Sequence, residues 1–308
     1  MSTVLFTHKS SLAHDTSAGH PERIARIEAV YKALSGSSYE ALIRKEAPRA
    51  TGADLALIHD PDYVKLVLEN IPEEGYARLD ADTIFSPGSG EAALRAAGAV
   101  MAAVDEVVAR RASNAFCAVR PPGHHAEPRR GMGFCLFNNV AVGAKHARAA
   151  HGLKRVAIVD FDVHHGNGTQ AAFYADTDTL FASTHQFPHY PGTGAASETG
   201  VGNIFNAPLE ANSGGAAFRA AMEGKILPAL RAFRPEILFV SAGFDAHARD
   251  PLASLQFEEG DFEWATRQLL DIAAEFAEGR LVSTLEGGYD LEALANSVQA
   301  HVGTLMSA

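Results

Sequence analysis

Short apolar runs alternate with longer helical stretches along the chain. The runs at 4–7, 115–119, 156–160, 180–183, 237–241 and 281–285 are mostly continuous in apolar residues, which is typical of strands covered on both faces. Helical patterns occupy 21–34, 62–69, 90–111, 138–151, 216–233, 262–278 and 291–305. This alternation predicts an α/β fold with a parallel sheet and helices on both of its faces.

Glycine and proline are spread along the chain, and no repeat, low-complexity tract or linker interrupts it. We therefore expect one domain over residues 1–308. The alanine-rich stretch at 90–111 contains Gly98, which predicts close packing of that helix against the sheet or a neighbouring segment.

Composition narrows the range of partners and environments. The 308 residues carry a formal net charge of −11, which argues against nucleic acid as the main ligand. Cys117 and Cys135 lie in apolar runs, so we expect buried, reduced thiols. No secretory signal and no long apolar segment is evident, so we expect a cytoplasmic protein without a membrane partner. The oligomeric state stays open, a homo-oligomer included.

Residues able to carry chemistry follow the predicted strands. Ligands of open parallel sheets bind beyond the carboxyl ends of the strands. Five predicted strands are followed by His, Asp or Tyr with glycine nearby, and these strands supply His124 and His125, Asp160, Asp162 and His164, His185, Asp245, and Tyr289. One rim of the sheet therefore gathers most of the reactive side chains.

A catalytic metal site is the simplest use of this rim. Asp162 and His164 are two residues apart, so in an extended segment both side chains point the same way. Asp245 follows another strand and supplies a third ligand. Two carboxylates and one imidazole leave a coordination position open for water and substrate, and they suit zinc or another borderline divalent ion.

The adjacent histidines predict proton transfer beside this metal. The imidazoles of His124 and His125 titrate near neutrality and can pass a proton between water and a leaving amine. Asp160 and Asn167 are candidates for fixing their tautomers. A Gly-Gly turn precedes Tyr289, whose phenol can donate a hydrogen bond to an oxygen that develops negative charge.

Eight motifs in a fixed order carry a resemblance over nearly the whole chain. They are GHPER (19–23), DTIFSPG (82–88), RPPGHHA (120–126), GFCLFNN (133–139), DFDVHHGNGTQ (160–170), YPGTG (190–194), GFDAHARDPL (243–252) and EGGYDL (286–291). Together they closely resemble the histone deacetylase family, particularly its class II-like bacterial members and the acetylpolyamine amidohydrolases. The resemblance implies a three-layer α/β/α fold of the arginase/deacetylase type, with a mostly parallel sheet of about eight strands.

The resemblance also implies roles for the residues that match the family motifs. Asp162, His164 and Asp245 match the ligands of one zinc ion. His125 matches the general base and acid, and His124 its electrostatic companion paired with Asp160. Asn167 stands opposite His125, where class I members have Asp, and Tyr289 matches the tyrosine that polarises the carbonyl.

Further matches concern the substrate and a second cation. The residues that match substrate-binding positions are Gly133 and the aromatic tunnel walls Phe134 and Tyr190, the lip residue Leu252, the rim carboxylate Asp82, and Arg23 of the internal product cavity. Family members bind potassium beside the zinc, which here would use Asp160, Asp162, His164, Ser183 and Thr184.

These observations predict a zinc-dependent amide hydrolase that removes acetyl or other acyl groups from acyl-lysine or a similar N-acyl amine. An acetylpolyamine amidohydrolase is the alternative; it favours an acidic lip, where this chain has Leu252, although Glu127 or Glu198 could supply the acid. A non-catalytic acyl-lysine-binding protein is expected to lose Tyr289 or a zinc ligand.

A two-manganese ureohydrolase is a further rival with the same fold. It needs extra carboxylates where this chain has Gly166 and His247. The sequence leaves open the substrate, the acyl length, and the choice between zinc and iron.

Overall fold

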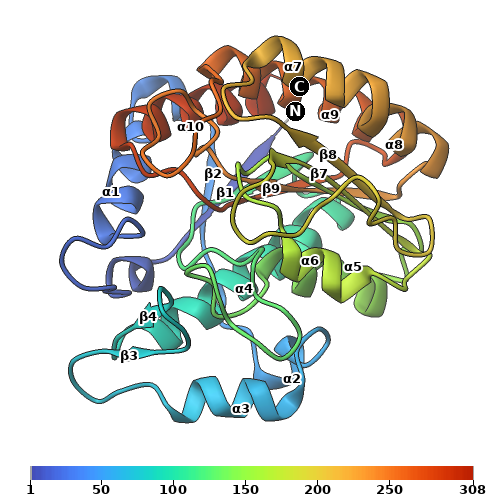
Figure 1. Cartoon of the computed structure of the whole chain (residues 1–308). Coiled ribbons are helices and arrows are strands. Elements are labelled where there is room, and N and C mark those ends of the chain that lie inside the picture. Colours follow the sequence, from blue (N-terminus) through green and yellow to red (C-terminus); the bar gives the residue numbers. More distant parts are fainter. Residues whose placement is uncertain (1, 308) are drawn as a thin grey trace.

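The computed structural model describes residues 2–307, and one eight-stranded sheet forms its centre (Figure 1). The strand order is β2-β1-β5-β10-β9-β6-β7-β8, and every neighbouring pair is parallel. These strands are β1 (Thr3–Thr7), β2 (Ile43–Glu46), β5 (Asn114–Cys117), β6 (Val156–Asp160), β7 (Thr179–Gln186), β8 (Ile204–Leu209), β9 (Ile237–Ala242) and β10 (Leu281–Leu285). The small strands β3 (Ala77–Arg78) and β4 (Ile84–Phe85) pair antiparallel outside this sheet.

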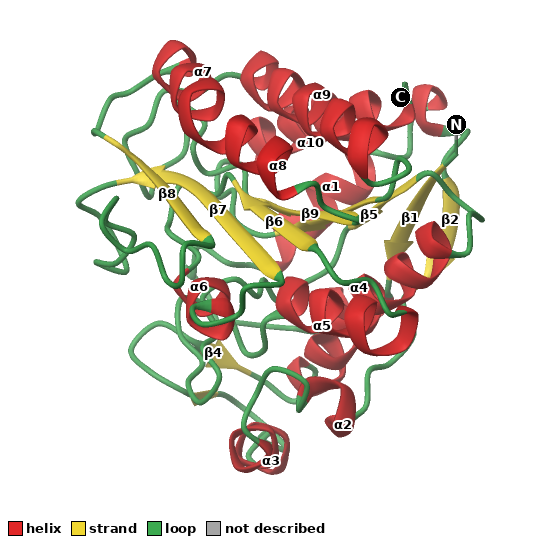
Figure 2. Cartoon of the chain, turned by 90° about the vertical axis from the view of Figure 1, so that its right-hand side faces the viewer, coloured by secondary structure: helices red, strands yellow, loops and turns green. Residues whose placement is uncertain are grey.

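Helices cover both faces of the sheet, as the apolar character of its strands requires. Figure 2 shows α1 and α7 to α10 on one face and α4, α5 and α6 on the other, with α2 and α3 beyond them. The α-helices are α1 (Ile24–Ala33), α2 (Gly52–Leu55), α3 (Pro61–Glu69), α4 (Ser89–Val108), α5 (Asn139–His151), α6 (Asn167–Phe173), α7 (Gly215–Ala221), α8 (Leu227–Phe233), α9 (Glu259–Phe276) and α10 (Leu291–Met306). Separate apolar cores fill the two sides of the sheet, and a third lies between α3 and α4.

The three-layer α/β/α architecture and the eight-stranded sheet are confirmed, but two strands escaped the sequence pattern. β2 is an edge strand of sequence IRKE with mostly exposed side chains, and β8 at the opposite edge contains Pro208. The helix predicted at 216–233 is also not one regular helix. A π-helical segment, Met222–Ile226, separates α7 from α8, and Pro228 opens the second piece.

Two smaller expectations are confirmed. A side chain at Gly98 would meet the carbonyl oxygen of Pro48 at 2.1 Å, so this glycine lets α4 pack against a neighbouring loop. Cys117 and Cys135 are buried free thiols. Among the described residues, no helix is both long enough and apolar enough to cross a bilayer.

The register of the sheet places the loops that carry the candidate site residues next to one another. Asp160, at the end of β6, pairs with Ser183 of β7 and with Ser241 of β9. The last pair between β9 and β10 joins Ala242 to Leu285. The loops that follow these four strands therefore leave the same edge of the sheet side by side.

Candidate active site

A pocket of about 200 Å³ opens at the carboxyl ends of strands β6, β7, β9 and β10. Every residue predicted for the substrate tunnel, its lip and its rim lines it, and the full lining is Asp82, His125, Gly133, Phe134, His164, His189, Tyr190 and Leu252. The lining is mainly apolar and aromatic, with polar groups at few points, which is the usual composition of a small-molecule site.

Asp162, His164 and Asp245 converge beside the pocket. One ligand atom from each lies within 4.8 Å of the other two. Nδ1 of His164 is 3.1 Å from a carboxylate oxygen of Asp162 and 3.1 Å from one of Asp245. All three residues are buried. Burial lowers the pKa of His164, but the hydrogen bonds to the two carboxylates outweigh it and raise the pKa to about 10. The same negative field that holds this proton suits a divalent cation.

The backbone is shaped to leave room for these carboxylates. A Cβ atom on Gly243 would lie 2.0 Å from Oδ2 of Asp162, and one on Gly287 would lie 2.0 Å from Oδ2 of Asp245. The Gly287 N–H donates to Oδ2 of Asp162 at 2.8 Å. Two carboxylates and one imidazole, oriented by backbone donors and with no fourth ligand from residues 2–307, fit an open zinc site.

The two adjacent histidines each meet a different partner through Nδ1. His124 contacts Oδ2 of Asp160 at 2.9 Å, and His125 contacts Oδ1 of Asn167 at 2.8 Å. The two ring centroids are 4.0 Å apart. These are the pairings that the sequence suggested, and they give neighbouring imidazoles one charged and one neutral partner.

The surroundings of the two imidazole rings shift their pKa values in opposite directions. Burial lowers the pKa of His124, but the charges of Asp162 and Asp160 outweigh it and raise the pKa well above the ordinary value. For His125, burial and the charges of His124 and His164 hold the pKa well below the ordinary value. His124 is therefore cationic and His125 neutral at pH 7, which suits His125 to accept a proton.

Tyr289 borders the same site. Its ring packs edge-on against Phe134 with centroids 5.9 Å apart. The arginine beside it is Arg26, whose guanidinium carbon lies 4.8 Å from the ring centroid. Arg26 is fully buried and donates to two carbonyls of segment 286–288. Assigning the internal cavity to Arg23 was wrong, because Arg23 is exposed at the N-cap of α1, and the helix turns Arg26 inward instead.

Glu286 is a buried residue to which the sequence assigned no role. One carboxylate oxygen accepts from the N–H groups of Gly123 and His124 at 2.7 and 3.2 Å, and the other accepts from the Ser241 hydroxyl at 3.0 Å. Burial raises its pKa to about 7. Glu286 thus ties the loop carrying the histidine pair to the end of β9.

Sequence reasoning also missed two residues around the pocket. His189 stacks on His164 with centroids 5.3 Å apart, and its Nε2 lies 3.2 Å from the Leu252 carbonyl. Asp250 accepts from the Tyr289 N–H at 2.7 Å and from the Leu252 N–H at 3.0 Å. Both lie within or next to recognised motifs, but only the folded loops reveal what they touch.

The residues matched to a potassium site lie on strands β6 and β7 and in the loop that follows β6. Ser183 pairs with Asp160 across the two strands, and Asp160 accepts from the N–H of Asp162 at 3.1 Å. The hydroxyl of Thr184 is buried and has no hydrogen-bond partner among the described residues.

The extra carboxylates of a two-metal site are replaced as the sequence indicated. A Cβ at Gly166 would meet Asp160 Oδ2 at 2.3 Å, so the position has no room for a ligand side chain. Nε2 of His247 points toward Glu259, 3.6 Å away on α9. A second metal beside the first would lack both ligands.

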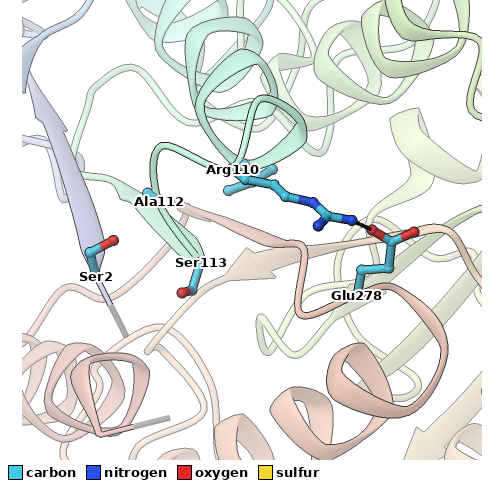
Figure 3. Close-up of a pocket in the computed structure, with 6 residues that line it drawn as sticks. Ser2, Arg110, Ala112, Ser113 and Glu278 are labelled. Atoms are coloured by element: carbon cyan, nitrogen blue, oxygen red, sulfur yellow. Dashed lines mark hydrogen bonds and ion pairs between the residues drawn. The ribbon is translucent and has the colours of Figure 1, made fainter.

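A second hollow lies at the other end of the strands, near their amino ends. It has about 320 Å³ and is lined by residues that precede β1, β5 and β10 (Figure 3). Its charged groups, Arg110 and Glu278, are paired with each other. None of the predicted site residues lies there, so the candidate active site is the pocket at the carboxyl ends of the strands.

Comparison with known proteins agrees with this geometry. The profile of the histone deacetylase domain matches residues 20–305. The chain belongs to the histone deacetylase family. Histone deacetylase 14, chloroplastic, of Arabidopsis thaliana is 42% identical over 320 residues, covering 96% of this chain and 74% of the relative. A histone deacetylase-like amidohydrolase of Pseudomonas aeruginosa is 42% identical over 282 residues, covering 88% and 73%.

Solved structures extend the comparison to the fold. The crystal structure of the HDA15 HD domain superposes with a TM-score of 0.93 at 34% sequence identity, covering 99% of this chain and 90% of that one. Family membership and fold are therefore established for essentially the whole chain. The family is generally zinc-dependent, and the converging Asp162, His164 and Asp245 are candidate ligands.

Proposed function

We propose that this chain is a zinc-dependent deacylase that hydrolyses the amide bond of acyl-lysine or a similar N-acyl amine. The observation that carries the proposal is the convergence of Asp162, His164 and Asp245 next to the neutral His125 in one apolar pocket. Deacetylase and amidohydrolase relatives support the same reaction class. We also propose that residues 1–308 form a single domain.

Asp162, His164 and Asp245 would hold the ion. When bound, zinc supplies a Lewis acid that polarises the acyl carbonyl and lowers the pKa of a water molecule. His125 accepts the proton of the attacking water and returns one to the leaving amine. The phenol of Tyr289 donates a hydrogen bond to the carbonyl oxygen as negative charge develops there.

The remaining residues orient these groups and exclude water. His124, held by Asp160, stays cationic and places positive charge beside the reacting centre. The rings of Phe134 and Tyr190 line an apolar passage for the alkyl chain of the substrate. Asp82 lies at the same pocket and can accept hydrogen bonds from the substrate backbone.

The lip favours acyl-lysine over acetylpolyamine. Leu252 contributes an apolar side chain to the pocket. The alternative acids are engaged elsewhere, since Glu127 accepts from Asn167 at 2.8 Å and Glu198 from Gln170 at 2.6 Å. Potassium at the Ser183–Thr184 segment and a cytoplasmic location remain predictions.

The decisive experiment compares turnover before and after the metal is removed. We expect the purified chain to hydrolyse acetyl-lysine peptides, to lose activity on chelation, and to regain it with about one zinc equivalent per chain. A hydroxamate should inhibit it, and His164→Ala should be inactive. A panel of acyl-lysine peptides and acetylated polyamines, ranked by kcat/KM, then identifies the substrate class. Zinc-loaded protein that turns over none of the panel contradicts the proposal.

A further inference from the structure

The carboxylate of Glu127 contacts the Asn167 side-chain amide that faces His125, and the nitrogen of this amide also donates to the His125 backbone carbonyl at 3.4 Å. Oε1 of Glu127 accepts a hydrogen bond from Nδ2 of Asn167 at 2.8 Å, while Oδ1 of the same amide lies 2.8 Å from Nδ1 of His125. A carboxylate accepts from an amide nitrogen but gives nothing to an amide oxygen. If the amide were flipped, its oxygen would face the carboxylate and its nitrogen the imidazole.

The orientation of the amide fixes the tautomer of His125. An amide oxygen can only accept, so Nδ1 of His125 must carry the proton. Nε2 then keeps its lone pair, on a ring that lines the substrate pocket. A base that abstracts a proton from water needs that lone pair.

Glu127 is itself held firmly through its backbone. Its N–H donates to the Arg130 carbonyl at 2.8 Å. Its carbonyl lies 3.1 Å from Nδ1 of His59, whose Nε2 accepts from the Asn138 N–H at 2.9 Å. Nδ1 of His59 must therefore be the donor. These contacts fix the backbone from which the carboxylate reaches Asn167.

We propose that Glu127 is a positioning residue that sets the tautomer of His125 through the amide of Asn167. The proposal rests on the proposed function, because it assigns His125 as the base. It adds a third member to the His125–Asn167 pair and gives that pair a direction: the carboxylate accepts from the amide, and the amide accepts from the imidazole.

Exchanging the carboxylate and the amide tests this direction. Asn167→Asp alone places two carboxylates 2.8 Å apart and should lower kcat about tenfold or more, with KM nearly unchanged. In Glu127→Gln/Asn167→Asp the glutamine can donate to the new carboxylate, which still accepts from His125. We expect the double variant to recover most of the activity, with a coupling of about tenfold between the two sites.

A matched control is available through Gln170, which lies on α6 with Asn167. Glu198 accepts from the side-chain amide of Gln170 at 2.6 Å, and that amide leads to His165 at 3.0 Å instead of His125. Glu198→Gln should therefore leave kcat within about twofold and show no coupling to Asn167→Asp. Simple multiplication of the Glu127→Gln and Asn167→Asp effects, or equal coupling of Glu198→Gln, overturns the proposal.

Nitrogen-15 spectra of labelled histidine separate this proposal from the proposed function. With the His125 signals assigned by their loss in His125→Asn, the wild-type ring should be the Nδ1–H tautomer, and Glu127→Ala should mix the tautomers. That result would stand even for a chain without turnover. An unchanged tautomer in Glu127→Ala would overturn the role of Glu127 even in an active deacylase.

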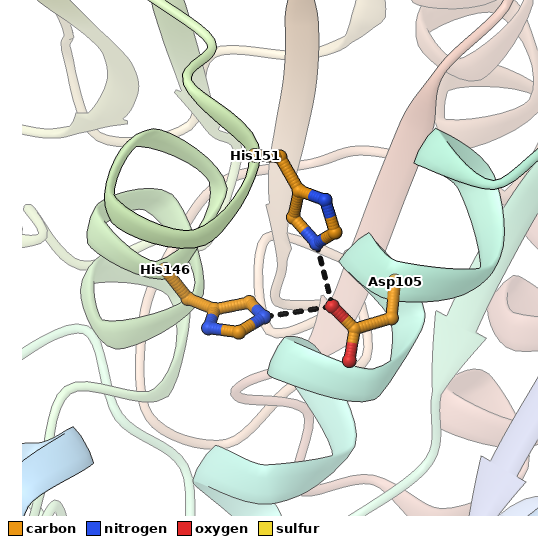
Figure 4. Close-up of side chains that lie close together, drawn as sticks. All are labelled: Asp105, His146 and His151. Carbon is orange, nitrogen blue, oxygen red and sulfur yellow. Dashed lines mark hydrogen bonds and ion pairs between the residues drawn. The ribbon is translucent and has the colours of Figure 1, made fainter.

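A separate side-chain cluster forms on the outer side of the α4–α5 pair. Nε2 of His146 and Nε2 of His151 lie 2.8 and 2.7 Å from the same carboxylate oxygen of Asp105 (Figure 4). One ligand atom from each residue lies within 4.8 Å of the other two. Their side chains are partly exposed, so an ion and water can reach them.

We infer that Asp105, His146 and His151 form a second divalent-cation site, with water as the remaining ligand. Two imidazoles and a carboxylate are the ligand types that zinc prefers. The helices hold them in place because Gly143 of α5 approaches α4 closely, and a Cβ there would meet Val100 at 2.4 Å. The contacts that carry this inference do not involve the candidate active site.

Zinc titration of protein whose active site is already filled with one equivalent and capped by a hydroxamate tests the site. We expect a second equivalent to bind with micromolar affinity, to disappear in His151→Ala and in Asp105→Asn, and to persist in the surface control Glu28→Gln. Absence of a second equivalent, or its persistence in both cluster variants, overturns the inference.

Discussion

Replacing Glu22 with glutamine removes the carboxylate that two buried arginines share. Glu22, Arg26 and Arg120 are all fully buried. Glu22 accepts from Nη1 of Arg26 at 2.9 Å and from Nη2 of Arg120 at 2.6 Å, and Nε of Arg120 also contacts it. The variant leaves two buried cations facing a neutral amide.

The expected loss of stability follows from this burial. Breaking a buried ion pair by removing one partner costs about 3–5 kcal/mol, because the remaining charge stays desolvated. Glutamine keeps the shape and one acceptor oxygen, so we expect the free energy of unfolding to fall by about 3 kcal/mol, toward the lower end of that range.

The pH dependence of this loss has a definite sign. Burial raises the pKa of Glu22, but Arg120 and His14 outweigh it and hold the pKa well below the ordinary value. A depressed carboxyl pKa stabilises the fold fully above the pKa of the unfolded chain, about 4.3, and this contribution disappears as pH falls through the folded-state pKa. The difference between wild type and Glu22→Gln should therefore be constant from about pH 8 to pH 5 and shrink only at more acidic pH.

Urea unfolding at pH 7, pH 5.5 and about pH 3.5, followed by circular dichroism and by the fluorescence of Trp264, measures the loss of stability and its pH dependence. Glu28→Gln is the control, because Glu28 is an exposed glutamate on α1, the helix that follows Glu22, and it should change stability by less than about 0.5 kcal/mol. A loss below about 1 kcal/mol for Glu22→Gln would refute the reasoning, since water would then be solvating the guanidinium groups.

Three further predictions concern the pocket and the core. Tyr289→Phe should keep its zinc content while kcat falls roughly 10²–10³-fold, as measured by peptide turnover and metal analysis. Gly243→Ala should weaken zinc binding by about 10–100-fold in a competition titration, since the added Cβ would lie 2.0 Å from Oδ2 of Asp162. Thiol titration should detect neither Cys117 nor Cys135 in the native chain and both after unfolding, because burial raises the pKa of both thiols.

The sequence pattern predicted the centre of the sheet better than its edges. Strands β5, β6, β9 and β10 are buried on both faces, so their sequences are mostly apolar, and even polar positions such as Ser283 and Thr284 of β10 are buried. Edge strand β2 has a charged, exposed sequence, and only its parallel register with β1 identifies it as a strand. Such pairing is a tertiary property, which local periodicity does not contain.

The candidate site residues were likewise predicted best where they follow central strands. Residues that end central strands were predicted because the parallel topology sends every such residue to one edge. Arg23 was assigned in place of Arg26 because a motif match gives a position in the chain but not the face of the helix that turns inward. Glu127, Glu286 and His189 contact segments that are far from them in sequence, and no local pattern reports those contacts.

The concentration of buried acid at this edge of the sheet makes it a favourable place for a cation. Carboxylates are costly to bury unless they are paired or bind a metal. Asp160 pairs with His124, which also lies 3.8 Å from Asp162, and Asp162 and Asp245 both face His164. Glycines at the neighbouring turns bring backbone N–H groups close but add no positive side chain. A divalent ion would balance the carboxylates of Asp162 and Asp245 around one imidazole, so we expect the stability of this edge to depend on the metal.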